Sequence, residues 1–61
     1  MHWEERLPEE GETVKIEFAE WTHMGTQIGV FLRYWDGNAI IDFGRVKRYL
    51  SRHGTFYVWT R

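Results

Sequence analysis

The chain is short, rich in aromatic residues and free of cysteine: it has 61 residues, of which 18% are Phe, Trp or Tyr, and a formal net charge of −1. A chain of this length supports one hydrophobic core, so we expect a single domain over residues 1–61. Without cysteine it has neither a disulfide framework nor a thiolate zinc site, and a cytoplasmic location is the default expectation.

The charges are unevenly spread along the chain. Residues 1–20 carry seven Glu and two basic residues, a balance of −5, whereas residues 21–61 carry six basic and two acidic residues, a balance of +4. A dipolar molecule is therefore expected. No stretch approaches the roughly 18 apolar residues of a membrane span, and the first residues lack the pattern of a secretory signal, so we expect neither a membrane anchor nor export.

The N-terminal third predicts an extended segment followed by a strand. Residues 1–12 contain the only Pro and five Glu with little periodicity, which indicates an extended lead-in ending in a turn at Glu10 and Gly11. From residue 13, apolar residues alternate with other residues in the period-two pattern of a strand with one buried face. These apolar residues are Val14, Ile16 and Phe18.

The middle of the chain predicts two strands joined by a tight hairpin. After a turn at residues 22–25, residues 27–35 form the second strand, and residues 39–43 form the third. The intervening Asp36-Gly37-Asn38 is a strong hairpin signal, because these residue types accept positive φ. One face of the second strand then carries Ile28, Val30, Leu32 and Tyr34, and the other carries Phe31, Arg33 and Trp35.

Residues 45–53 predict a short helix. The spacing of Val46, Tyr49, Leu50 and His53 is i, i+3, i+4, i+7, and Gly54 follows where a helix C-cap is expected. The remaining positions carry a basic patch of Arg45, Lys47, Arg48 and Arg52. Residues 55–60 return to β-type residues and form the last strand.

These elements predict a mostly β (α+β) fold of about four strands with one short helix before the last strand. Two architectures suit that order: a small SH3-like barrel, and an open antiparallel sheet with the helix packed on one side. In either case we expect the core to contain Val14, Ile16, Phe18, Ile28, Val30, Leu32, Ala39, Ile41, Phe43, Phe56 and Val58.

The segment Arg6-Leu7-Pro8-Glu9-Glu10-Gly11-Glu12-Thr13-Val14 resembles the opening of a family of small phage and prophage proteins catalogued only as a domain of unknown function. Its members carry a Trp, an acidic stretch, R-L-P-x-x-G-x-x-V, and then short strands around a D-G turn. Here Trp3 lies closer to the motif than the family's Trp, and the Arg-rich segment 45–52 has no counterpart. The resemblance implies a phage-related origin, hence a bacterial host cell, and supplies no catalytic residue.

No arrangement of residues indicates catalysis, a cofactor or a metal. His2, His23 and His53 lie far apart, and none has a second ligand at the spacing of a local metal site. Ser51, the only Ser, has no glycine-flanked nucleophile turn around it. The Glu residues cluster without the apolar pocket that acid–base catalysis needs. We therefore expect a protein that is not an enzyme.

An aromatic and basic face is the most distinctive feature. With the expected core turned inward, the opposite face carries Trp21, Phe31, Arg33, Trp35, Tyr57, Trp59 and Arg61. Trp, Tyr and Arg are typical of hot spots in protein interfaces, and aromatic and basic residues also form platforms for single-stranded nucleic acid. Alternatively, Trp3 and the lead-in cover these rings and make a second small core.

The overall charge decides between the two kinds of partner. Nucleic-acid binders usually have pI values above about 9, whereas this sequence has a pI of about 6.3. We therefore expect a small protein-binding module. The resemblance of residues 6–14 implies that this module is of phage-accessory type and inhibits or modulates a host protein. The alternative is a small β-domain that binds nucleic acid through the aromatic face and the basic patch. A homo-oligomer is a further alternative, because small domains without disulfides or structural metals are often stabilised by association with a partner chain.

Overall fold

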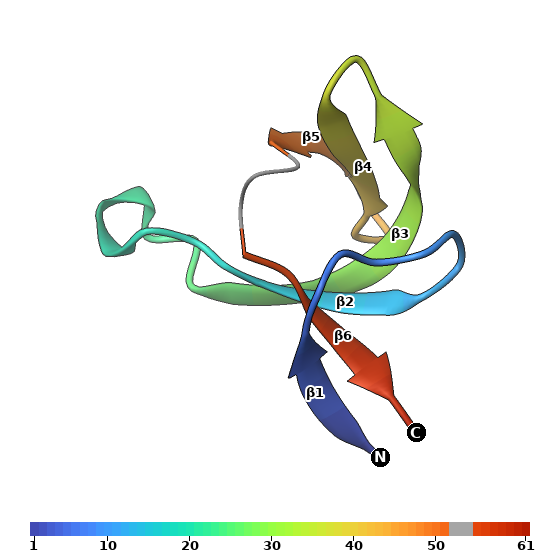
Figure 1. The fold of residues 1–61 in the computed structure, drawn as a ribbon. Coiled ribbons are helices and arrows are strands. Elements are labelled where there is room, and N and C mark those ends of the chain that lie inside the picture. The colour runs from blue at the N-terminus through green and yellow to red at the C-terminus, as the bar shows by residue number, and fades with distance from the viewer. Residues whose placement is uncertain (52–54) are drawn as a thin grey trace.

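A computed structural model describes residues 1–51 and 55–61, and all of their strands belong to one antiparallel sheet (Figure 1). The strands lie in the order β1-β6-β2-β3-β4-β5, so that β1 and β5 are the two edges. Their bounds are β1 His2–Glu5, β2 Thr13–Glu17, β3 Thr26–Trp35, β4 Asn38–Asp42, β5 Lys47–Ser51 and β6 Tyr57–Thr60. A single 3-10 turn, η1 (Glu20–Thr22), lies between β2 and β3.

The long strand β3 connects the two halves of the sheet. It pairs with β2 through its first residues and with β4 through its last ones, and the pairing shifts between Phe31 and Arg33. A β-bulge of this kind bends the strand and increases its twist. Figure 1 accordingly shows β4 and β5 turned away from the plane of β1, β6 and β2.

The mostly β, antiparallel character is confirmed, as is the strand predicted from residue 13. Val14 is fully buried and lies opposite Gly29 of β3 and Val58 of β6. We call the face that carries Val14 the inner face, and its reverse the outer face. The core on the inner face contains Val14, Ile16, Phe31, Ala39, Ile41, Phe56 and Val58, with Phe18, Phe43 and Leu50 packed against it.

The predicted orientation of β3 is wrong in its first half. Ile28 and Val30, expected in the core, are 57% and 40% exposed, whereas Phe31, expected on the partner face, is 2% exposed. Directly opposite residues share a face, so Gly29 points inward beside Val14 and its two neighbours point outward. A Cβ on Gly29 would lie 2.7 Å from the Asp42 carbonyl oxygen, so this inward position accepts only glycine.

Beyond the bulge, the orientation agrees with the prediction for Arg33 and Trp35. Both are exposed, and Arg33 lies opposite Ile40 on the outer face. Leu32, expected in the core, is half-buried at the bulge. The hairpin is confirmed as a two-residue turn, in which Asp36 and Gly37 have φ values of 49° and 77°, as a type I′ turn requires.

The predicted helix is wrong over the described residues, because residues 47–51 form strand β5. Gly44 adopts φ 93°, and the Phe43 N–H donates to the Val46 carbonyl over 2.9 Å, so the chain turns back onto β4. Leu50 then lies opposite Ala39 and packs against the core. Residues 52–54, which include the predicted Arg52, His53 and Gly54, lie outside the described residues.

The predicted count of four strands is also wrong, since the lead-in supplies a further strand. Residues 2–5 form β1, which pairs with β6. The turn predicted at Glu10 and Gly11 is confirmed, and the Gly11 N–H donates to the Phe31 carbonyl over 2.8 Å. The lead-in is therefore tied to the sheet at both ends.

The same substitution at two isoleucines, one on the inner face and one on the outer face, tests the assignment of the two faces. Ile41→Ala should lower the free energy of unfolding by about 2–5 kcal/mol, because Ile41 is fully buried and its truncation leaves a cavity. Ile28→Ala should lower it by less than about 1 kcal/mol, as expected for an exposed site. Urea denaturation of both variants measures the difference. Equal losses would contradict the assignment of inner and outer faces.

Candidate binding surface

The outer face of β1, β6, β2 and β3 carries a continuous group of side chains. Cross-strand pairs place Trp3 opposite Trp59, and Lys15 opposite both Tyr57 and Ile28. Residues that lie directly opposite share a face, so these side chains are neighbours across four strands. We call this group the aromatic strip, and its members are Trp3, Lys15, Ile28, Val30, Tyr57 and Trp59.

The rings of the aromatic strip are held in place by contacts with one another and with Lys15. The ring centroids of Trp3 and Trp59 are 4.9 Å apart, with the planes tilted by 59°. The Lys15 Nζ lies 4.9 Å from the Trp3 ring and 5.2 Å from the Tyr57 ring. Such aromatic and cation–π contacts each contribute about 0.5–1 kcal/mol and fix the ring orientations before any partner arrives.

A shallow apolar hollow lies within this strip. It has a volume of about 260 Å³ and is lined by Trp3, Thr13, Ile28 and Trp59. Of the lining residues, Ile28 and Trp59 are exposed, and the exposed Val30 lies beside the hollow, opposite Thr13. Adjacent exposed apolar side chains around a hollow mark an interaction site more often than a solvated surface.

The structure does not bring the predicted partner-face residues together on one surface. Tyr57 and Trp59 belong to the aromatic strip, but Arg33 and Trp35 lie beyond the bulge, where the Arg33 guanidinium carbon is 5.1 Å from the Trp35 ring centre. Trp21 is 81% exposed on η1. The remaining two predicted residues, Arg61 and Phe31, are exposed beyond β6 and buried in the core, respectively.

The predicted partner face left out four members of the aromatic strip: Trp3, Lys15, Ile28 and Val30. Trp3 was placed against these rings only in the alternative of a second small core, and the structure does pack it against Trp59. Trp3 lies in the acidic lead-in, whose sequence shows little periodicity. Ile28 and Val30 flank Gly29, and a glycine inside a strand often marks a close approach of another backbone. This glycine is the one sequence signal that could have indicated that Ile28 and Val30 point away from the core.

The basic patch lies along an edge strand and the turn before it. Arg45, Lys47 and Arg48 are exposed, and none forms an ion pair within residues 1–51 and 55–61. Lys47 lies opposite Asp42, and Arg48 lies opposite the buried Ile41, so these two basic side chains occupy different faces. The fourth predicted member, Arg52, lies outside the described part of the chain.

A second hollow, of about 400 Å³, lies where β2, β5 and the start of β6 meet. Its lining residues are Ile16, Glu17, Phe18, Ala19, Leu50, Ser51, Thr55, Phe56 and Tyr57. Among the lining residues that the structure describes, Glu17 is the only carboxylate, so these residues do not form the carboxylate pair of an acid–base site.

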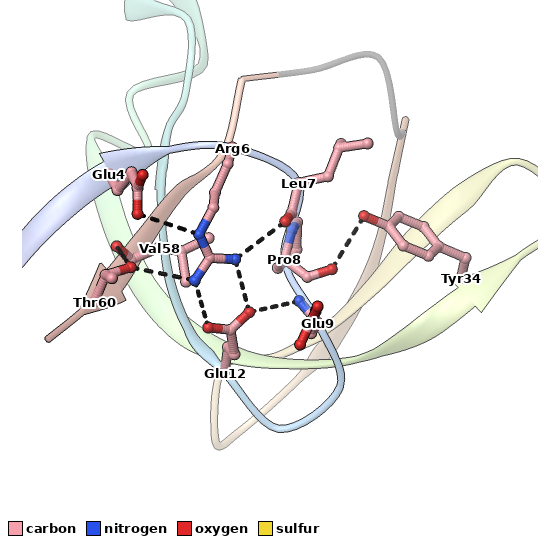
Figure 2. A network of polar contacts seen from close by, with 9 residues as sticks. All are labelled: Glu4, Arg6, Leu7, Pro8, Glu9, Glu12, Tyr34, Val58 and Thr60. Atoms are coloured by element: carbon pink, nitrogen blue, oxygen red, sulfur yellow. Dashed lines mark hydrogen bonds and ion pairs between the residues drawn. The ribbon is translucent and has the colours of Figure 1, made fainter.

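The densest polar cluster surrounds Arg6 (Figure 2). Its guanidinium donates two hydrogen bonds to the Glu12 carboxylate, over 2.9 and 2.6 Å. It donates three longer ones: to the Thr60 hydroxyl over 3.2 Å, the Leu7 carbonyl over 3.3 Å and the Glu4 carboxylate over 3.4 Å. Glu12 also accepts a hydrogen bond from the Glu9 N–H over 2.7 Å. The cluster therefore joins the end of β1 to the start of β2 and to β6.

This cluster does not provide a group for proton transfer near neutral pH. The hydrogen bonds from Arg6, together with that from the Glu9 N–H, lower the pKa of Glu12 from 4.5 to about 2, and Glu12 in turn raises the pKa of Arg6. Both groups stay charged at neutral pH. Their role is structural.

The residues that carry the phage-family resemblance also have structural positions. Arg6 forms the cluster, Pro8 is buried, and Val14 belongs to the core. Gly11 lies in the turn that is bonded to Phe31. The motif thus accounts for the geometry of the lead-in, and the aromatic strip lies largely outside it.

Residues 1–51 and 55–61 contain neither a cluster of metal ligands nor a membrane-spanning helix. No group of three or more His, Asp or Glu side chains is placed to hold a metal ion there. Within the same residues no helix is long and apolar enough to cross a membrane.

No family model, curated protein or solved structure matches the chain.

The Arg6–Glu12 contact predicts a specific pH dependence of stability. Because the pKa of Glu12 is lowered on folding, its contribution is complete above about pH 4.5 and is lost as the pH falls towards 2. Glu12→Gln should flatten the stability profile in this window and lower the thermal midpoint at pH 7 by roughly 5 °C. Thermal unfolding followed by circular dichroism measures both effects.

Glu10→Gln is the matched control, since Glu10 is exposed and lies in the same loop. Its profile between pH 2 and 4.5 should follow that of the wild type. The same flattening in both variants would show that the pH dependence does not come from the Arg6–Glu12 contact.

Proposed function

We propose that the protein is a non-enzymatic module that binds another protein through the aromatic strip. The observation that carries this proposal is the exposure of Ile28 and Trp59 at one apolar hollow, with Val30 exposed next along the same face of β3. An interface core of this kind excludes water from aromatic and aliphatic groups at its centre, with polar residues at its rim. The fixed rings of Trp3 and Trp59 lower the entropy lost on binding, since their orientation is already set.

The composition of the strip favours a protein over a nucleic acid. Stacking platforms for single strands combine exposed ring faces with Arg or Lys side chains that follow the phosphates. Here the rings of Trp3 and Trp59 pack against one another at a tilt of 59°, and Lys15, the one cation of the strip, lies over the rings of Trp3 and Tyr57. Ile28 and Val30 offer apolar surface without stacking. The basic patch belongs to the opposite end of the sheet.

Nucleic acid remains the second candidate, at a different place. Beyond the bulge, Arg33 lies against Trp35 on the outer face of β3. Tyr49 of β5 is 65% exposed on the same face of the sheet. Lys47 follows on that face, opposite Asp42. Alternating aromatic and basic side chains of this kind suit a short single strand.

The finer features of the proposal rest on topology and on resemblance. The order β1-β6-β2-β3-β4-β5 leaves β1 and β5 as two separate edges, so of the two predicted architectures the structure has the open antiparallel sheet and not the closed SH3-like barrel. A phage-accessory role as an inhibitor or modulator of a host protein, in the bacterial cytoplasm, rests on the resemblance of residues 6–14.

Ile28→Glu tests the aromatic strip directly. The substitution places a charge beside the hollow while leaving the core untouched, so the fold should be kept and partner affinity should fall at least about tenfold. Tagged wild type and variant are compared as baits in a nuclease-treated bacterial lysate, and retained proteins are identified by mass spectrometry. With a purified partner, Trp59→Ala should cost about 2 kcal/mol, or roughly 30-fold in Kd.

Trp21→Ala is the matched control, because it removes an exposed ring outside the strip. It should retain the same partner as the wild type. A partner that binds Ile28→Glu as well as the wild type would contradict the assignment of the strip as the interface.

The second candidate predicts a strong salt dependence. Affinity for a labelled single-stranded oligonucleotide should then fall by orders of magnitude between about 50 and 200 mM salt, and Lys47→Ala should reduce the slope by about one. Fluorescence anisotropy measures both. Micromolar binding at low salt with that slope, unchanged in Ile28→Glu, would replace the protein-binding proposal with the second candidate.

A further inference from the structure

The sheet ends in two edges of opposite charge. The acidic edge is β1, with the sequence His2-Trp3-Glu4-Glu5, and the basic edge is β5, with the sequence Lys47-Arg48-Tyr49-Leu50-Ser51. The two strands do not contact one another, and Figure 1 shows them at opposite ends of the molecule. Within the described residues, β1 pairs only with β6 and β5 only with β4, so at Trp3, Glu5, Lys47 and Tyr49 the side of the strand that faces away from the sheet has no strand beside it.

The backbone groups that face outward can be assigned on both edges. Hydrogen-bonded pairs alternate along an antiparallel ladder. The Arg6 N–H donates to the Phe56 carbonyl over 3.2 Å, so His2 and Glu4 direct their backbone groups towards β6, while Trp3 and Glu5 direct theirs outward. By the same reasoning from the Phe43–Val46 bond, Lys47 and Tyr49 direct theirs outward from β5.

We propose that the chain self-associates head to tail, with β1 of one copy adding antiparallel to β5 of the next. One register joins Glu5 to Lys47, Glu4 to Arg48 and Trp3 to Tyr49 across the junction. It places the outward backbone groups of Trp3 and Glu5 opposite those of Tyr49 and Lys47, as strand addition requires.

The same register matches the faces of the two sheets. Glu5 and Trp3 lie on the outer face, through their pairing with Tyr57 and Trp59. Lys47 and Tyr49 also lie on the outer face, through Asp42 and Ile40. Glu4 and Arg48 both lie on the inner side, since they oppose the buried Val58 and Ile41, respectively. Every cross-junction pair thus shares a face, and two of them are ion pairs.

Charge on edge strands normally prevents such addition. Edges that carry the same charge repel one another, which is how many β proteins avoid edge-to-edge association. Here the two edges carry opposite charges. The same charges that repel β1 from a second β1, or β5 from a second β5, attract β1 to β5. The residues substituted to test the junction, Glu5 and Lys47, lie outside the aromatic strip. The test of the junction is therefore separate from the test of the proposed partner interface.

Sedimentation velocity measures the association between about 10 µM and 1 mM protein. A short exposed junction is small compared with a stable interface, so assembly should grow over this range at low salt and weaken as salt screens the ion pairs. Glu5→Lys and Lys47→Glu should each weaken association about tenfold, because each places like charges across the junction.

The decisive measurement mixes the two variants in equal amounts. Each junction between unlike variants again joins opposite charges, so the mixture should associate as strongly as the wild type, as should the double variant Glu5→Lys/Lys47→Glu. Glu10→Lys makes the same charge change in the exposed loop and should leave association unchanged. Thermal midpoints of all variants confirm that the fold is kept.

Two results would overturn the proposal. One is a wild type that stays monomeric up to about 1 mM in low salt, the upper end of the range over which assembly should grow. The other is association that survives both single variants, or that the mixture fails to restore. Either result leaves the aromatic strip and its proposed partner unaffected.

Discussion

The paired hydrogen bonds between Arg6 and Glu12 are the constraint on which the N-terminal part of the molecule depends. Strand β1 is four residues long and has one neighbour, and so short a pairing is marginal by itself. Arg6 follows directly after β1, and it fixes the start of β2 and the end of β6 at a single point. Because β1 carries Trp3, the position of that ring against Trp59 depends on an ion pair that lies outside the aromatic strip.

The parts of the fold that were predictable from the sequence are those set by local signals. Alternation in residues 13–17 and the Asp36-Gly37 turn need no distant partner to be recognised. Residues 28–35 were harder because apolar side chains occupy both faces, so periodicity gives a strand without saying which face is buried. The close approach of β4 to Gly29 decides that, and it is a non-local contact. The segment 45–51 fits helical and strand spacing alike, and its pairing with β4 decides the outcome.

The candidate surface divides in the same way. Tyr57 and Trp59 were found because they alternate cleanly with buried residues of the last strand. Trp3 was missed because both faces of an edge strand contact water, which removes the alternation on which recognition depends. The basic residues were found but grouped wrongly, since a helix would place Arg45, Lys47 and Arg48 around one surface, whereas strand β5 directs Lys47 and Arg48 to opposite faces.

The lack of room for a side chain at Gly29 also limits how the sequence of this protein can change while the fold is kept. A side chain there would meet the Asp42 carbonyl and the side chains of Ile41 and Phe43, all within 3 Å, so the backbones of β3 and β4 would have to separate before anything larger could enter. Descendants of this chain can exchange one apolar residue for another at most core sites, but not at this one. A homologue whose sequence has otherwise diverged should therefore keep a short pattern around this position. The pattern is a glycine between two apolar residues, an aromatic residue two positions after the glycine, and later an Asp-Gly turn.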